Sequence, residues 1–364
     1  MEPTTYCTNI HPGESWEEIR SGVLGHAPAV AAAVCPDRPF PVGLRLSGRA
    51  SLEIDDAAAR TFADEAASLG LTFRTINGFP YGRFHHTPVK ESVYLPDWRD
   101  PERAAYTLRL ARLLAAWLAE GESGSISTVP IGFRQGFPDA ALPAAYAAIR
   151  RTLAALAGLY ETTGRRIRLA VEAEPGCLIE TTAQMAAFFA AVDAPPAHMD
   201  HLCVCYDCCH QALQYEDPVA SLALLAKNSI AVGHVQVSSA LHYDGADVSR
   251  LARFVEPVYL HQAVARLHDG TLCRFDDLPQ AISARLDGVA SWRVHFHLPI
   301  FVSQLPECTT TQPFLRTILP LFAPSIPLEV ETYTWSVLPA ELKTQGLTQS
   351  IIREIAWVEA ARRP

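Results

Sequence analysis

Residues 167–174 read IRLAVEAE, and residues 201–210 read HLCVCYDCCH. Each segment is an apolar run that acquires acidic or imidazole side chains only towards its end. The segment between them, from Thr182 to Val192, is rich in alanine and phenylalanine and predicts a short helix. The order is therefore strand, helix, strand. In parallel α/β barrels the carboxyl ends of such strands form the catalytic face, so these segments predict both the fold and the position of the site.

The same alternation of strands and helices extends over the rest of the chain. About eight strand–helix repeats favour a closed (β/α)8 TIM barrel over a doubly wound sheet, and we expect a single domain over residues 1–364. Residues from about 240 to 290 contain no clear repeat and predict an insertion between strands seven and eight, followed by one extra extended segment at 292–298. The remaining strands are predicted at 4–10, 42–47, 71–76, 125–131, 230–238 and 328–333, and the remaining helices at 55–69, 101–119, 140–160, 218–226 and 349–361.

The composition argues against several classes of protein. The net charge is −9 and the pI is about 5.8, whereas nucleic-acid binders usually carry a basic surface, so no nucleic-acid partner is expected. No uncharged apolar run approaches the length of a membrane span, and the first residues lack the basic and apolar regions of a signal peptide. The nine cysteines are an odd number and lie largely within apolar runs. We therefore expect a soluble, cytoplasmic protein with reduced cysteines.

Two strand ends carry residues that suit a divalent metal. Alternation puts Glu172 and Glu174 on the same side of their strand, and two carboxylates in a barrel mouth require a cation or a shared proton. Salt bridges, for example to Arg168, are the alternative. Asp207 is followed three residues later by His210, which offers an oxygen and a nitrogen ligand to one ion. A helix-capping Asp with a surface His is the alternative for that pair.

Three further extended segments bring paired polar residues to one face. Any one pair is compatible with a buried, hydrogen-bonded group. Together with the segment of Glu172 and Glu174, however, four segments carry such a pair, which indicates a site. The pairs are His234 with Gln236, His295 with His297, and Glu329 with Glu331.

Four cysteines lie close together on strand six and just after it. Structural zinc ligands are usually separated by a turn of two to four residues, and this spacing differs, so we predict that the cysteines are buried packing residues. A thiolate zinc site is the alternative. The four are Cys203, Cys205, Cys208 and Cys209.

The polar residues at the strand ends resemble the site of the xylose-isomerase-like TIM-barrel superfamily of sugar isomerases, epimerases and apurinic endonucleases. Its members place Glu, Asp-x-x-His, His and Glu on strands five to eight around Mn²⁺, Mg²⁺ or Zn²⁺. Gln236 stands where members carry a histidine, and a neutral amide oxygen favours Mn²⁺ or Mg²⁺ over Zn²⁺, or indicates weakened metal binding. The metal ligands that the resemblance implies are Glu172, Asp207, Gln236 and Glu331.

More closely, the chain resembles the EboE family, the metabolite-traffic protein E of the ebo gene cluster. The resemblance implies a role in moving or maturing a metabolite, with other proteins of the cluster as partners, and specifies no reaction. The matching strings are YCTNIHPGE from Tyr6, NGFPYGRFHH from Asn77, VKESVYLPDW from Val89, SISTVPIGF from Ser125, VQVSSAL from Val235, YLHQAVARLHDG from Tyr259, VHFHLPIF from Val294 and LEVETYTW from Leu328.

The superfamily resemblance implies a metal-dependent isomerase or epimerase that acts on a small polyhydroxylated metabolite, a sugar or a cyclitol. Glu172 and Glu331 would then be both metal ligands and the acid/base pair that moves a proton beside a carbonyl. The residues expected around the substrate are His11, Asn77, Lys90, Glu174, His210, His234, His295 and His297.

Two other functions stay open at this point. The first is a carrier that binds its metabolite without converting it. Gln236 keeps this function open, because a neutral amide in that position indicates weakened metal binding. The second is a metal-dependent phosphoesterase of the apurinic-endonuclease branch, in which His295 and His297 would supply the additional ligands.

Overall fold

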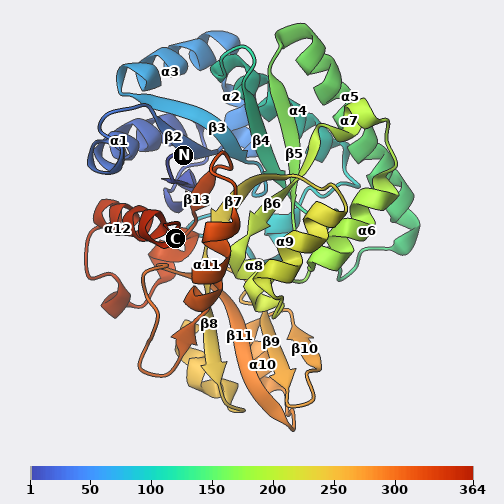
Figure 1. Ribbon diagram of the computed structural model, residues 1–364, viewed down its shortest axis with the longest axis vertical. Helices are drawn as coiled ribbons and strands as arrows, with labels where there is room; N and C mark the ends of the chain where they lie inside the picture. The colour runs from blue at the N-terminus through green and yellow to red at the C-terminus, as the bar shows by residue number, and fades with distance from the viewer. Residues whose placement is uncertain (1, 364) are drawn as a thin grey trace.

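Eight parallel strands form a nearly closed barrel (Figure 1). The computed structural model describes residues 2–363, so residues 1 and 364 of the expected domain lie outside the described chain. The strand order is β1-β13-β7-β6-β5-β4-β3-β2, and a bridge between Cys7 and Gly43 joins the two edges. The predicted (β/α)8 barrel is confirmed. Its strands are β1 (Thr5–Tyr6), β2 (Phe40–Arg45), β3 (Leu71–Asn77), β4 (Ser123–Thr128), β5 (Arg166–Glu172), β6 (Leu202–Asp207), β7 (Val232–Val237) and β13 (Leu328–Val330).

Helices cover the outside of the barrel, and several begin at a polar side chain that satisfies a free backbone N–H group. Thr181 and Gln184 form a capping box at the start of α6, and Asp217 accepts a hydrogen bond from Ala220 at the start of α9. The helices are α1 (Trp16–Val34), α2 (Gly48–Glu53), α3 (Asp56–Ser68), α4 (Pro101–Trp117), α5 (Leu142–Thr163), α6 (Thr182–Val192), α7 (Pro196–Met199), α8 (Cys208–Leu213), α9 (Pro218–Lys227), α11 (Gln312–Ile318) and α12 (Leu347–Ala361).

A second, antiparallel sheet lies between β7 and β13 in the sequence and extends from one end of the barrel (Figure 1). It has its own apolar core, which includes Trp292, Phe254 and Leu241. The insertion is therefore longer than the predicted 240–290, because residues 292–298 lie in its central strand rather than in a separate segment. Its elements, in sheet order, are β10 (Leu272–Phe275), β9 (Ala263–Leu267), β11 (Val289–Leu298), β8 (Ser239–Asp244) and β12 (Thr309–Thr310), with α10 (Leu278–Ser283) beside them.

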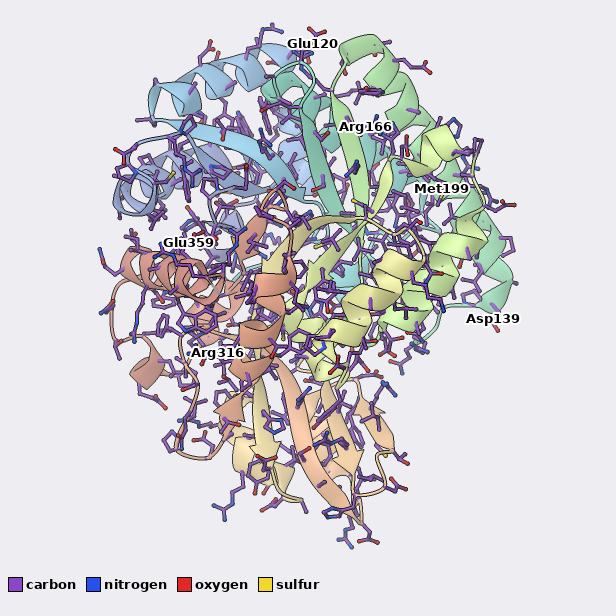
Figure 2. All side chains as sticks on the ribbon, viewed as in Figure 1. Glu120, Asp139, Arg166, Met199, Arg316 and Glu359 are labelled. Atoms are coloured by element: carbon purple, nitrogen blue, oxygen red, sulfur yellow. The ribbon has the colours of Figure 1, made fainter. Side chains whose placement is uncertain are left out.

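Aromatic side chains pack the helices onto the barrel. Phe62 of α3 stacks on Phe73 of β3 with 4.9 Å between ring centroids, and it meets Trp16 of α1 at 5.0 Å. The two ends of the chain are also joined, because Glu359 of α12, labelled in Figure 2, accepts a hydrogen bond of 3.1 Å from the backbone nitrogen of Thr4. Among residues 2–363, no helix is long and apolar enough to cross a membrane.

Three predicted strands end at least three residues early in the structure, and each is followed by a turn. The first strand gives way to a 3-10 turn, Thr8–Ile10, and the last gives way to another, Tyr333–Val337. The predicted strand 125–131 ends at Thr128, and Ile131 has a φ of 70°, a left-handed conformation that a strand does not accommodate. These turns redirect the polar side chains that follow the strands.

Candidate active site

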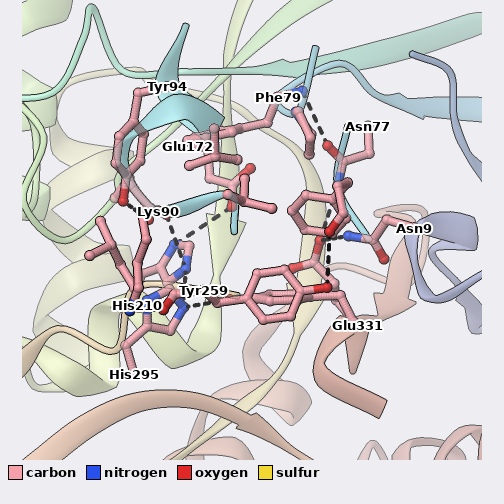
Figure 3. Close-up of a pocket in the computed structure, with 17 residues that line it drawn as sticks. Asn9, Asn77, Phe79, Lys90, Tyr94, Glu172, His210, Tyr259, His295 and Glu331 are labelled. Carbon is pink, nitrogen blue, oxygen red and sulfur yellow. Dashed lines mark hydrogen bonds and ion pairs between the residues drawn. The ribbon is translucent and has the colours of Figure 1, made fainter. Parts of the chain in front are cut away.

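One pocket opens where the carboxyl ends of the barrel strands meet the insertion (Figure 3). Its cavity volume is about 60 Å³, several times the roughly 10–15 Å³ that one water needs. Aromatic rings, among them Phe79, Tyr94 and Tyr259, form much of its wall, and carboxylates and imidazoles form the rest. The pocket therefore suits a small ligand with both polar and apolar surface.

Three buried carboxylates meet at this end of the barrel. Glu172 ends β5, Asp207 ends β6 and Glu331 follows β13, and one oxygen of each lies within 4.8 Å of the others. Burial raises the pKa of Glu172 and of Glu331 well above the usual range, and the neighbouring carboxylates raise both further. Glu172 Oε2 and Asp207 Oδ2 have no hydrogen-bond partner in the described chain. Free carboxylate oxygens that repel one another fit a hard divalent cation.

Three side-chain amides surround Glu331. Asn9 and Asn77 donate hydrogen bonds of 2.8 and 3.0 Å to its Oε1. In the orientation that satisfies both of its amide atoms, Gln236 also donates its nitrogen to Glu331, and its oxygen accepts a hydrogen bond of 3.3 Å from Asn77. Asn9 was missed in the sequence, although it lies two residues before His11 at the end of strand one. These amides hold Glu331 in place and offset part of its negative charge.

Three histidines form a second buried group beside the carboxylates. His210 comes from α8, whereas His295 and His297 come from β11 of the insertion. Nε2 of His295 lies 3.2 Å from Nε2 of His210 and 3.1 Å from Nε2 of His297. Burial lowers the pKa of His210 to about 3, of His297 to about 4, and of His295 well below the usual value. The three imidazoles are therefore neutral at pH 7.

A hydrogen-bonded chain ties the insertion to the barrel. The Gln262 side chain donates to the Tyr94 hydroxyl at 2.8 Å and to the Pro175 carbonyl at 3.0 Å, and Tyr94 donates to Glu174 Oε1 at 3.2 Å. The remaining atom of the amide, Gln262 Oε1, accepts a 2.7 Å bond from His295 Nδ1. Gln262 and Tyr94 were not predicted from the sequence, because neither follows a barrel strand.

Lys90 lines the pocket, but its ammonium group binds the insertion. Nζ lies 2.7 Å from Asp277 Oδ2 and donates to the carbonyls of Tyr259 and Glu256 at 2.7 and 3.3 Å. Four other residues that the sequence analysis expects around a substrate also line the pocket: Asn77, Glu174, His210 and His295.

His11 and His234 lie away from the pocket. The 3-10 turn Thr8–Ile10 redirects His11, which stacks on His26 with 4.4 Å between centroids and contacts the Tyr6 hydroxyl at 3.1 Å. His234 is buried in the barrel, where its Nδ1 lies 2.7 Å from Ser125 Oγ. The alternation of side chains places His234 on the same face of the strand as Gln236. The two residues are two positions apart, however, which is roughly 6–7 Å along the strand.

The alternatives left open for these segments can be compared with the geometry. Arg168 forms no ion pair with Glu172 or Glu174 in the described part of the chain. Asp207 does cap α8, since its Oδ1 accepts a hydrogen bond from the His210 backbone nitrogen, but His210 is buried rather than exposed. All nine cysteines are free, and Cys203 and Cys205 pack against Ala170 inside the barrel.

The sequence matches the family described as xylose isomerase-like TIM barrel over residues 39–276. The chain belongs to this family. That match covers more than half of the chain and includes strands β2 to β10, and so the first part of the insertion. A search of curated proteins finds no match.

Two solved structures share the fold of this chain. The structure of L-ribulose 3-epimerase has a TM-score of 0.51 at 12% identity, with 100% of this chain and 95% of that chain covered. The IolI protein, solved with a zinc atom, has a TM-score of 0.52 at 10% identity, with 99% and 98% covered. At such identities the likeness establishes the xylose isomerase-like architecture and nothing about residues or substrate.

Proposed function

We propose that this protein is a metal-dependent isomerase or epimerase that acts on a small polyhydroxylated metabolite, a sugar or a cyclitol. The observation that carries the proposal is the buried group of Glu172, Asp207 and Glu331 on the pocket, with unpartnered oxygens on the first two. L-ribulose 3-epimerase and the zinc-containing IolI protein have the same fold, which supports this class of reaction.

The residues proposed to hold the metal are Glu172, Asp207, Gln236 and Glu331. The three carboxylates are hard oxygen donors, so Mn²⁺ or Mg²⁺ is favoured, with Zn²⁺ as a further option. Gln236 would join them through its amide oxygen once that oxygen leaves Asn77. When bound, the ion would polarise a substrate oxygen and stabilise negative charge as it develops there.

Glu172 and Glu331 are the residues proposed to transfer the proton. Glu172 and Glu331 are buried, and burial raises the pKa of both, which is the condition under which a carboxyl group accepts and returns a proton near neutral pH. Asn9 and Asn77 donate hydrogen bonds to Glu331 Oε1. The orientation of Oε2 then depends on its contact with Gln236. His210, His295 and Glu174 would contact the polar part of the substrate.

The aromatic wall would exclude water and hold the substrate's less polar face. Asn77 and Lys90 complete the pocket, although Lys90 would act through its stem because its ammonium group is already bonded. On the resemblance to the EboE family, we propose further that this metabolite belongs to an ebo-type cluster, with proteins of that cluster as partners and the cytoplasm as the location.

Solvent-deuterium exchange tests the proposal, because it reports proton abstraction before the natural product is known. Wild-type protein with Mn²⁺ is expected to exchange the proton beside the carbonyl of a bound ketose or keto-cyclitol. Glu331→Gln should lower the exchange rate by about 10²–10⁴-fold. Glu216→Gln is the matched control, since Glu216 is a half-buried carboxylate that binds Thr182 and lies outside the pocket. Equal rates in wild type and Glu331→Gln would reject the assignment.

One observation favours a carrier as the second candidate. Glu331 already accepts hydrogen bonds from three amides, which leaves it less able to bind a cation or to move a proton. A carrier would show saturable binding of such ligands in calorimetry with no exchange above that of buffer.

A further inference from the structure

One wall of the pocket is formed by Glu174, His210 and His295, which come from three different elements. Glu174 follows β5, His210 lies on α8, and His295 lies on β11 of the insertion; Figure 3 shows the two imidazole rings next to each other. All three side chains are buried and line the pocket, and one nitrogen or oxygen atom of each lies within 4.8 Å of the other two. The ligand that fits this wall depends on whether these atoms donate or accept hydrogen bonds.

Both imidazoles accept through Nε2, because their Nδ1 atoms carry the hydrogen. Nδ1 of His210 lies 2.9 Å from the Ala173 carbonyl, and a carbonyl oxygen only accepts. Nδ1 of His295 lies 2.7 Å from Gln262 Oε1, and the nitrogen of the same amide donates to the Pro175 carbonyl, so the oxygen must face His295. A neutral imidazole has one N–H group. Nε2 of each ring is therefore a bare lone pair.

The neighbouring groups of the described chain supply few donors to these acceptors. Glu174 Oε2 lies 3.2 Å from His210 Nε2 and donates to it only when the carboxyl group is protonated. Burial and neighbouring carboxylates raise the pKa of Glu174 well above its usual value, which favours that protonated form while no ligand is bound. The Tyr333 hydroxyl lies 3.4 Å from His295 Nε2, which is longer than an ordinary hydrogen bond.

Neither His297 nor a basic side chain supplies the missing donors. His297 Nε2 lies 3.1 Å from His295 Nε2, but the Nδ1 of His297 donates to the Glu331 carbonyl at 2.7 Å, so this Nε2 is also a lone pair. Lys90 is the one lysine or arginine that lines the pocket in the described chain, and its ammonium group is bound to Asp277 and to backbone carbonyls. The wall therefore requires donors from a ligand.

Aromatic rings adjoin these acceptors. Phe84, Tyr259 and Tyr333 line the pocket and pack against one another, with 5.4, 5.3 and 5.0 Å between their centroids. The faces of such rings attract a cation, and an ammonium group carries three N–H donors and no acceptor. A protonated amine therefore suits both the aromatic rings and the three acceptors beside them.

We propose that the substrate carries a protonated amine, which donates hydrogen bonds to Glu174 Oε2, His210 Nε2 and His295 Nε2, and that it is an amino-substituted sugar or cyclitol. This inference rests on the proposed function, of which it names the substrate class. As the ammonium group enters, Glu174 gives up its proton to solvent and accepts as a carboxylate. The bond between Glu174 and His210 is thus replaced by bonds from the ligand to both.

The charges around the pocket agree with a cationic ligand. Glu172, Asp207 and Glu331 together carry one more negative charge than a divalent ion neutralises, and ionised Glu174 adds another. The Lys90 ammonium group is already paired with a carboxylate. Such a surface attracts a positive group and repels a negative one, so a phosphorylated sugar is disfavoured.

Calorimetry of the Mn²⁺-loaded protein tests the proposal with ketoses that differ only at the first carbon: 1-amino-1-deoxy-D-fructose, D-fructose and D-fructose 1-phosphate. The amine is expected to bind about tenfold more tightly than D-fructose, and the phosphate should bind most weakly. At pH 7 the amine should also release about one proton from Glu174, seen as a binding heat that varies with the ionisation heat of the buffer. D-fructose should release none.

Glu174→Gln keeps an oxygen acceptor for the Tyr94 hydroxyl but cannot ionise. The variant should therefore lose most of the preference for the amine over D-fructose, together with the proton release. Glu180→Gln is the matched control, since Glu180 is a buried carboxylate six residues further along the chain that binds Arg134 and does not line the pocket. This control should keep both the preference and the proton release.

The outcomes separate this proposal from the proposed isomerase function. An amine preference without deuterium exchange keeps the ammonium site and rejects the reaction, whereas exchange with equal affinities for amine and D-fructose does the reverse. Tighter binding of the phosphate, or a crystal structure of the amine complex with a metal ion on these three acceptors, also overturns the site. If none of the three sugars binds, methylammonium chloride is compared with potassium chloride. The ammonium ion should shift the nitrogen NMR signals of His210 and His295, and unchanged signals overturn the proposal.

Discussion

The stability of the protein should depend on pH through Glu354, a buried carboxyl group behind the site. Its Oε1 accepts hydrogen bonds from the Thr332 hydroxyl at 2.6 Å and from the Ile300 backbone nitrogen at 3.1 Å, whereas Oε2 has no partner in the described chain. Burial raises the pKa of Glu354 from 4.5 to about 7. The folded protein therefore holds this proton more tightly than the unfolded chain does.

The sign and size of the effect follow from that difference. Below pH 4.5 the group is protonated in both states, and as the pH rises to about 7 only the unfolded chain gives up its proton, so the free energy of unfolding falls. At about 1.4 kcal/mol for each pH unit, the interval from 4.5 to about 7 corresponds to about 3 kcal/mol. Glu354→Gln removes the ionisation and keeps an oxygen acceptor, so the variant should gain about 3 kcal/mol relative to wild type between pH 4 and pH 8.

Denaturant unfolding of both proteins at several pH values measures this difference directly. The other buried carboxyl groups titrate in both proteins and cancel in the comparison. Glu120→Gln, at an exposed position labelled in Figure 2, controls for the loss of a surface charge. Parallel stability curves for wild type and Glu354→Gln across this range would refute the reasoning.

Three further predictions concern the core, the cysteines and Gln236. Phe62→Ala should lower the free energy of unfolding by about 3–5 kcal/mol, because its ring packs on Phe73 and Trp16, and a loss below about 1 kcal/mol in denaturant titrations would contradict this. Replacing Cys208 and Cys209 together with Ala should leave the metal content unchanged in elemental analysis, and loss of a stoichiometric zinc would identify them as ligands. Gln236→His adds an imidazole beside three carboxylates, so competition with a zinc chelator should show tighter zinc binding than in wild type.

Much of the barrel was predictable because the residues within each helix or strand determine the type of that element. The helix predicted from Thr182 to Val192 begins and ends at those residues in α6, since the change from a two-residue to a helical period and the cap at Thr181 are both encoded there. The ends of strands were less predictable. Turns after Cys7 and Val330 depend on contacts with other parts of the chain, and those turns decide that Asn9 rather than His11 faces the site.

The site was predictable only where it is built from barrel strands. Glu172, Asp207 and Glu331 were identified because parallel strands bring their ends together in any barrel of this kind. Gln262 and Tyr94 depend instead on how the antiparallel pairing of β9 with β11 places the insertion against the loop after β3. Neither the register of that pairing nor the course of the loop can be derived from periodicity alone.

The polar side chains at this end of the fold come from two parts of the molecule, the barrel and the insertion. Within the barrel, strand ends supply carboxylates and amides, and the amide of Gln236 contacts Glu331. The imidazoles come from elsewhere: His210 follows Asp207 on α8, and β11 adds His295 and His297. Because β11 pairs with β8, which follows β7 after a single residue, the strand that carries Gln236 leads directly into the sheet that supplies two imidazoles. Imidazoles from the insertion and carboxylates from the barrel thus lie next to one another at the carboxyl end of the strands.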